Sequence, residues 1–196
     1  MAAHGAVDGL VNNAGIIQPF VPVAELGHED IRRVLEVNLM GTINMVKAFL
    51  PLLLARPEAH IASVSSMGGC FPFPGQTLYG ASKAGVRLLT EGLYAELLDT
   101  RVGVSVIMPG AVATAITENS GVSIAATDSG GFPMTPPDRA ARIMIDGIER
   151  NRLHVYVGRD AQVMSLTIRT APRLAIRLVQ KQMAKLTQGQ ATPAGR

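Results

Sequence analysis

The sequence is poor in the residues that form cross-links and metal sites. Its 196 residues contain one cysteine, Cys70, no tryptophan and only 4% aromatic residues. A single cysteine excludes an internal disulfide and fits a reducing compartment, so we expect a cytoplasmic location. The four histidines are scattered without the spacing of metal ligands, and we therefore expect no metal site.

Long apolar runs and clusters of charge are also missing. The longest apolar run, Ala48–Ala55, contains Pro51 and is well short of the roughly 18–20 residues that a membrane span needs. The N-terminus lacks the basic start and apolar core of a signal peptide. The net charge is only +3, and no cluster of lysine and arginine precedes Asp138, so we expect no nucleic-acid binding.

The residues that are plentiful indicate a globular α/β protein. Hydrophobic residues make up 47% of the chain and charged residues 17%, with 20 glycines and 12 prolines for tight turns. This length predicts one domain. We interpret residues 1–186 as that single domain and residues 187–196 as a polar tail.

Apolar runs and helical periods alternate along the chain. The runs predict buried strands at Val7–Asn12, His60–Ser65, Val102–Met108 and Leu153–Val157. Helical spacing predicts helices from Glu29 to about Leu54, from Leu78 to about Leu98, from Pro136 to about Asn151, and around Pro172. This order favours a doubly wound parallel sheet, Rossmann-like in class, with ligands beyond the carboxyl ends of its strands.

Three details of this interpretation concern the ends of elements. We expect Pro51 to kink or end its helix. Thr77 is expected to cap the helix that follows it. The stretch Ala111–Met134 is rich in Ser, Thr and Gly and has no period, so we interpret it as a mobile segment.

A tyrosine and a lysine four residues apart begin the second long helix. The spacing places Tyr79 and Lys83 on one face, one turn apart. A phenol is a weak acid at neutral pH, and a neighbouring ammonium is expected to lower its pKa towards the working range. A surface pair without function is the alternative, and the neighbouring motifs have to decide between the two.

Those motifs occur in order and in register. They are the turn Asn12–Gly15, Asn38 within Glu36–Thr42, Ser66 thirteen residues before Tyr79, and Pro109–Thr114. Together with Tyr79 and Lys83, they resemble the short-chain dehydrogenase/reductase family. The resemblance implies an NAD- or NADP-dependent oxidoreductase that moves a hydride between nicotinamide and a ketone or secondary alcohol.

The resemblance also implies a role for each residue. Tyr79 would be the acid or base, Ser66 would bind the substrate oxygen, Lys83 would hold the ribose hydroxyls, and Asn38 would hold a water. Asn12, Ala14 and Gly15 would line the adenosine side of the cofactor, and Pro109, Gly110, Val112 and Thr114 would form the segment that holds the nicotinamide. The alternatives are structural: a turn residue for Ser66, with Ser65 as its rival, a polar kink for Asn38, and a helix cap for Thr114.

One element of the family pattern is absent from these residues. No G-x-x-x-G-x-G phosphate loop occurs in the sequence, which begins close to the Asn12–Gly15 strand. We therefore expect the fold to be truncated at its N-terminus, with that strand left as an apolar edge. The alternative function is a catalytically silent fragment that acts only as an oligomerising or interaction module.

Two stretches suggest partners. The loop Met67–Pro74 is apolar and follows Ser66, which favours a lipophilic substrate, unless it only packs against the next helix. Basic residues recur every fourth position from Arg169 to Lys185 with leucines between them, a pattern typical of weak contact with a membrane surface or of a solvated helix. The family also implies a homo-oligomer.

Overall fold

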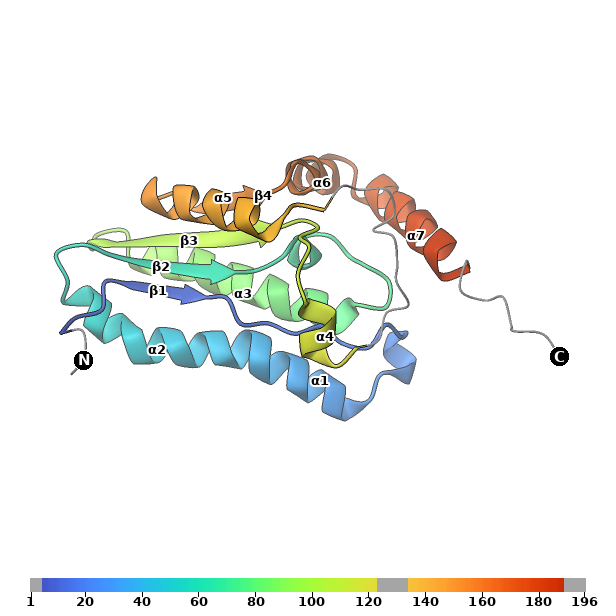
Figure 1. Ribbon diagram of the computed structural model, residues 1–196, viewed down its shortest axis with the longest axis horizontal. Coiled ribbons are helices and arrows are strands. Elements are labelled where there is room, and N and C mark those ends of the chain that lie inside the picture. The colour runs from blue at the N-terminus through green and yellow to red at the C-terminus, as the bar shows by residue number, and fades with distance from the viewer. Residues whose placement is uncertain (1–4, 123–133, 189–196) are drawn as a thin grey trace.

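Parallel strands form one sheet in the computed structural model, which describes residues 5–122 and 134–188 (Figure 1). The strands are β1 (Gly9–Asn12), β2 (Ala59–Val64), β3 (Val102–Pro109) and β4 (His154–Val157), in the spatial order β1-β2-β3-β4. All four predicted strands are confirmed to within two residues at each end. In the described part of the chain β1 pairs only with β2, and its Val11 is 56% exposed, so β1 is the expected apolar edge.

Helices cover both faces of the sheet, as predicted for a doubly wound fold. On one face, α2 (Gly41–Leu54) and α3 (Thr77–Glu96) bury leucines and valines against the fully buried Ile61 of β2. On the other face, α5 (Pro137–Glu149) packs on Ile107 and Val155. The alternation of apolar side chains along β2 and β3 supplies both cores, because successive strand residues point to opposite faces.

The first long helix is continuous but not regular. It comprises α1 (His28–Leu35), a π-helical turn (Glu36–Met40) and α2, and it ends three residues after Pro51, which lies in its last turn. The helix His28–Leu54 is long and apolar enough to cross a membrane. Core helices of globular proteins meet the same criterion of length and composition. Here Val46 and Leu53 are buried in the core against the sheet.

The remaining elements lie at the carboxyl end of the sheet or beyond it. They are the 3-10 turns Val23–Glu25 and Met67–Gly69 and the helices α4 (Ile116–Ser120), α6 (Arg159–Thr170) and α7 (Pro172–Gln188). The segment predicted to be mobile thus contains α4, while its residues 123–133 lie outside the described residues. The helix α7 runs two residues into the predicted tail, and residues 189–196 also lie outside the described part.

Candidate active site at the carboxyl ends of the strands

The four predicted catalytic side chains come from three separate parts of the chain that meet at one end of the sheet. Ser66 follows β2, Asn38 lies in the π-helical turn, and Tyr79 and Lys83 lie in the first two turns of α3. Parallel strands end at the same edge of the sheet, so residues distant in sequence are brought together there.

Lys83 is a buried cation. Its side chain is 3% exposed, and its Nζ donates a hydrogen bond of 2.9 Å to the Val64 carbonyl oxygen. Burial lowers the pKa of Lys83 to about 8. Gly15 lies directly beside it, since a Cβ at that position would come within 2.8 Å of Nζ. Because an ammonium has three donors, this geometry leaves Lys83 able to bind further acceptors.

Tyr79 and Ser66 form the second contact of the site. The Ser66 hydroxyl accepts a 3.0 Å hydrogen bond from the Gly68 amide, and it also hydrogen-bonds the Tyr79 hydroxyl. Burial raises the pKa of Tyr79, and the bond to Ser66 only partly opposes that rise. The expectation that Lys83 lowers the pKa of Tyr79 is therefore wrong for this structure, because desolvation of the phenol dominates.

The two neighbouring serines have different surroundings. Ser65 is buried, and its hydroxyl donates a 2.7 Å hydrogen bond to the Lys83 carbonyl oxygen in α3. Ser66 is only half-buried and faces Tyr79. Ser65 thus ties β2 to α3, while the hydroxyl next to the phenol belongs to Ser66.

Asn38 cross-links three parts of the site. Its Oδ1 accepts from the Ile16 amide at 2.8 Å, and its Nδ2 donates to the Ile16 carbonyl oxygen and to Ser82 Oγ, both at 2.9 Å. The helix around it forms a π-helical turn, so the irregularity of the structural alternative for Asn38 is present together with these cross-links. Both N–H donors of Nδ2 are occupied. A water could therefore bind this side chain only by donating a hydrogen bond to the second lone pair of Oδ1.

The turn after β3 is held from α6. The Gly110 amide donates to the Val157 carbonyl oxygen at 2.9 Å, and the Ala111 amide donates to Asp160 Oδ2 at 2.8 Å. A Cβ on Gly110 would overlap the Asp160 carboxylate, which explains a glycine there. Val112 is half-buried and bridges to Thr135, while Thr114 is exposed and makes no side-chain hydrogen bond among the described residues.

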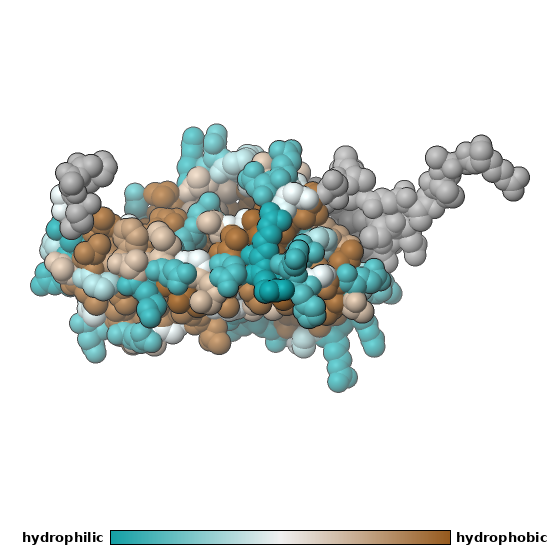
Figure 2. Space-filling view, turned by 90° about the horizontal axis from the view of Figure 1, so that it is seen from below, coloured by the Kyte–Doolittle hydropathy of each residue, from teal (hydrophilic) through white to brown (hydrophobic). Residues whose placement is uncertain are grey.

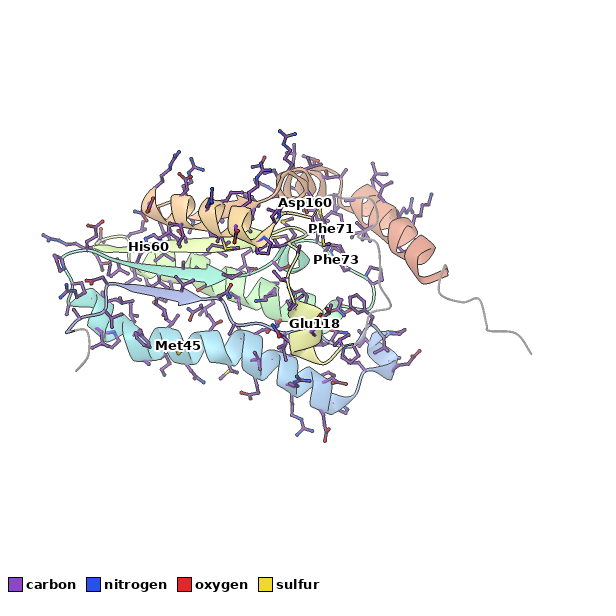
Figure 3. All side chains as sticks on the ribbon, in the orientation of Figure 1. Met45, His60, Phe71, Phe73, Glu118 and Asp160 are labelled. Atoms are coloured by element: carbon purple, nitrogen blue, oxygen red, sulfur yellow. The ribbon has the colours of Figure 1, made fainter. Side chains whose placement is uncertain are left out.

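The turn after β1 makes fewer contacts with the other elements of the site. Asn12 Nδ2 donates to Ser63 Oγ at 3.4 Å, whereas Ala14 is exposed. In the loop that follows Ser66, Phe71 is buried and Phe73 half-buried, with their ring centroids 6.0 Å apart. Figure 3 places both rings and Asp160 at the same end of the molecule.

Comparison with known proteins agrees with this arrangement. The family model for short chain dehydrogenases matches residues 1–123. SadH of Mycobacterium tuberculosis is 32% identical over 194 residues, which cover 94% of this chain and 70% of SadH. This chain belongs to the short-chain dehydrogenase family.

Other relatives give the same assignment. Dehydrogenase/reductase SDR family member 7B of Rattus norvegicus is 31% identical over 190 residues, covering 94% of this chain and 58% of that protein. A short chain dehydrogenase from Burkholderia cenocepacia, solved in complex with NADP, has a TM-score of 0.74 at 28% identity, covering 88% and 68% of the two chains. One from Burkholderia phymatum, solved in complex with NAD, has a TM-score of 0.76 at 26% identity, covering 88% and 69%. The chain therefore spans only part of the length of each.

Within this short-chain dehydrogenase, sequence reasoning missed the residue that caps α3. Gln18 is fully buried, and its Oε1 accepts hydrogen bonds from the Leu78 amide at 2.8 Å and the Tyr79 amide at 3.0 Å. The predicted cap, Thr77, is instead the first helical residue and makes no capping bond. A glutamine 60 residues away gives no local capping signal, so this contact is visible only in the structure.

Gln18→Met is expected to destabilise the fold by about 2 kcal/mol, because it leaves two partly buried helix amides without an acceptor. Thr77→Ala, at the position predicted from sequence, should stay within about 0.5 kcal/mol of the wild type. Urea unfolding of both variants measures the difference. Equal destabilisation by the two substitutions would show that Gln18 is not the cap.

Asp160 was missed for a different reason. It lies in the first turn of α6, where an acidic residue is ordinarily explained by the helix dipole. Its contact with Ala111 joins two segments 49 residues apart. The sequence Gly158-Arg159-Asp160 carried a helix-start signal, but nothing in it indicated which loop the carboxylate would hold.

Proposed function

We propose that this chain carries the hydride-transfer site of an NAD- or NADP-dependent oxidoreductase acting on a ketone or secondary alcohol. The observation that carries the proposal is the hydrogen-bonded pair of Tyr79 and Ser66, one helical turn from the buried Lys83. These three groups lie together at the carboxyl ends of the parallel strands. There the phenol can protonate a substrate oxygen, the hydroxyl can orient that oxygen, and the desolvated ammonium can bind the cofactor. The Burkholderia relatives solved with NADP and NAD support the choice of cofactor.

Tyr79 acts as the acid in the direction of reduction. Its raised pKa keeps the phenol protonated at neutral pH, so it can give a proton to an alkoxide oxygen as that oxygen forms. Ser66 donates a second hydrogen bond to the same oxygen. The nicotinamide, when bound, supplies the hydride.

The residues at the nicotinamide and ribose end of the site fit the cofactor. Among the described residues, only the Val64 carbonyl accepts from Lys83 Nζ, so donors remain for the ribose hydroxyls. Asp160 holds the turn at Gly110 and Val112 that would face the nicotinamide, with Thr114 on its carboxamide. Asn12, Ala14 and Gly15 would line the adenosine side. The phosphate end has no such support, since the sequence contains no Gly-rich loop.

A lipophilic ketone is the substrate class that suits the surroundings of Tyr79. Gly68 lies so close that a Cβ there would come within 3.0 Å of Tyr79 Cε1, and the loop continues into Phe71 and Phe73. An apolar loop that begins beside the phenol favours a substrate with few polar groups.

Assembly into a homo-oligomer through the long helices is part of the proposal. Apolar side chains are exposed on α2 at Met45 and Leu54, on α3 at Leu88, and at Leu98 just after α3. Figure 2, which views the molecule from below, shows brown apolar residues interspersed with hydrophilic ones on the face that includes α1 and α2. Apolar surface of this kind is typical of subunit contacts.

A catalytically silent interaction module remains the second candidate, and the missing phosphate loop favours it. Charge-assisted contacts are worth about 1.5–3 kcal/mol each, so losing several would weaken dinucleotide binding by several kcal/mol. In that case the exposed faces of α2 and α3 would be the functional surfaces.

Titration with NADH and NADPH, followed by fluorescence, separates the two candidates. The oxidoreductase proposal expects saturable binding of at least one cofactor and its oxidation when a lipophilic ketone is added. Absence of binding at millimolar cofactor would leave the interaction module as the function of this chain.

A further inference from the structure

Charge is distributed unevenly along the chain. Residues 1–160 contain twelve lysines and arginines and fifteen acidic residues, a net charge of −3. Residues 161–196 contain no acidic residue and six basic ones, a net charge of +6. The basic residues are Arg169, Arg173, Arg177, Lys181, Lys185 and Arg196. The modest total charge therefore conceals a strongly basic segment on a weakly acidic body.

The described part of this segment forms a two-helix unit with an exposed surface. In α7, Arg173, Arg177 and Lys181 are all exposed, and no carboxylate of the described residues forms an ion pair with them. A spacing of four residues places these three cations on one stripe of the helix. Figure 1 shows α7 extending away from the body of the sheet beyond α6.

Large apolar side chains lie beside the cations. Leu174 is 57% exposed and Leu178 is 54% exposed, and each immediately follows an arginine of the stripe. On α6, Val163 and Leu166 are 65% and 66% exposed. Among residues 172–181 of α7, Ala175 is the buried one, whereas Leu174 and Leu178 are not part of the core. We call the exposed cations and apolar residues of α6 and α7 the basic apolar face.

The two helices lie next to the candidate active site. The start of α6 packs into a buried cluster in which Ala161 joins Met67 and Met108 at the carboxyl end of the sheet. The loop that follows Met67 carries Phe71 and Phe73, which Figure 3 shows at the same end of the molecule as Asp160 at the start of α6. If α6 and α7 bind to another surface, that surface would therefore lie near the apolar loop Met67–Pro74, which begins beside Tyr79.

We propose that the basic apolar face docks onto an anionic lipid bilayer and holds the loop Met67–Pro74 close to that bilayer. Arginines and lysines interleaved with exposed leucines and valines, without acidic residues, complement both the charge of anionic headgroups and the apolar zone beneath them. An acidic protein partner would match the cations but not four large exposed apolar side chains. The docking also supplies a route for lipophilic ketones from the bilayer to Tyr79, and only this last step depends on the proposed function.

Vesicle flotation of the full chain tests the docking independently of any turnover. The probes are vesicles of phosphatidylcholine alone and vesicles in which about one third of the lipid is phosphatidylserine. We expect binding to the phosphatidylserine vesicles, weaker binding as salt rises, and little binding to phosphatidylcholine. The triple variant R173Q/R177Q/K181Q should bind on the order of 100-fold more weakly, because each cation near an anionic surface contributes separately.

Two further variants complete the design. R33Q/R139Q/R142Q removes three exposed arginines from α1 and α5 and should bind as the wild type does. L174Q/L178Q should weaken binding while keeping its salt dependence, since only the apolar part is removed. Circular dichroism of each variant reports whether the helices are retained.

Several outcomes would overturn the proposal. They are an absence of flotation, equal binding to both vesicle types, or equal loss in the R33Q/R139Q/R142Q variant. Light scattering that showed a dimer dissociated by L174Q/L178Q would assign the face to a second copy of the chain instead. Loss of cofactor binding with retained flotation would remove the proposed function and leave the docking intact.

Discussion

Tyr79→Phe is expected to lower kcat for ketone reduction by about 10²–10⁴-fold, the usual contribution of a positioned general acid. The substitution removes one oxygen atom, whose hydrogen-bond partner among the described residues is the Ser66 hydroxyl, so the fold should be unaffected. KM and cofactor affinity should change little, because phenylalanine keeps the ring in place beside Gly68. Steady-state rates with a lipophilic ketone measure the effect.

The chain contains a matched control on the same helix. Tyr94 lies in α3 as Tyr79 does, but it is 37% exposed and outside the site. Tyr94→Phe should leave kcat within about twofold of the wild type, as surface substitutions away from a site usually do. A comparable loss in the two variants would indicate a general effect on the helix instead of proton transfer by Tyr79.

Lys83→Met has the second large expected effect, and it depends on pH. Burial lowers the folded-state pKa of Lys83 to about 8, below the value near 10.5 of an exposed lysine. Between these values the unfolded chain binds more protons, so the free energy of unfolding of the wild type should rise with pH. The rise attributable to this group between pH 7 and 10 is about 2–3 kcal/mol, and Lys83→Met should lack it.

Urea unfolding at several pH values measures this difference. The window ends near pH 10 because the raised pKa of Tyr79 acts with the opposite sign above the pKa of an exposed tyrosine. Lys47→Met, on α2, is the control and should follow the wild-type pH profile. If the free energies of unfolding of the wild type and of Lys83→Met change with pH in the same way, the lowered pKa of a buried Lys83 is contradicted. In cofactor titrations, Lys83→Met should also weaken binding on the order of 100-fold, through two lost ribose contacts.

The backbone plan could be predicted from the sequence because the pattern that specifies it is local. Each strand is a short apolar run, and each long helix has a 3.6-residue period, so the order of elements and the layers followed directly. Spacing alone indicated the pair Tyr79 and Lys83, and the resemblance of the motifs to the short-chain dehydrogenase/reductase family added Asn38 and Ser66. Their shared location is then a consequence of parallel strands ending at one edge.

The sequence could not show contacts between segments distant in the chain. The cap that Gln18 provides and the bond from Ala111 to Asp160 each connect residues 49 or more positions apart, and neither follows a local pattern. The pKa of Tyr79 was predicted in the wrong direction for the same reason. The spacing of the two residues pointed to the Lys83 ammonium as the cause of a pKa shift. The burial of the Tyr79 phenol, which the linear sequence does not show, decides the direction of that shift.

Transfer of a labelled hydride tests the central claim most directly. The chain would be incubated with a lipophilic ketone and with NADH or NADPH carrying two deuterium atoms at nicotinamide C4, and the alcohol analysed by mass spectrometry. The account predicts an alcohol that carries one deuterium at the carbinol carbon with the wild type, and an amount reduced in proportion to kcat with Tyr79→Phe. An unlabelled alcohol, or no alcohol with either cofactor, would contradict it.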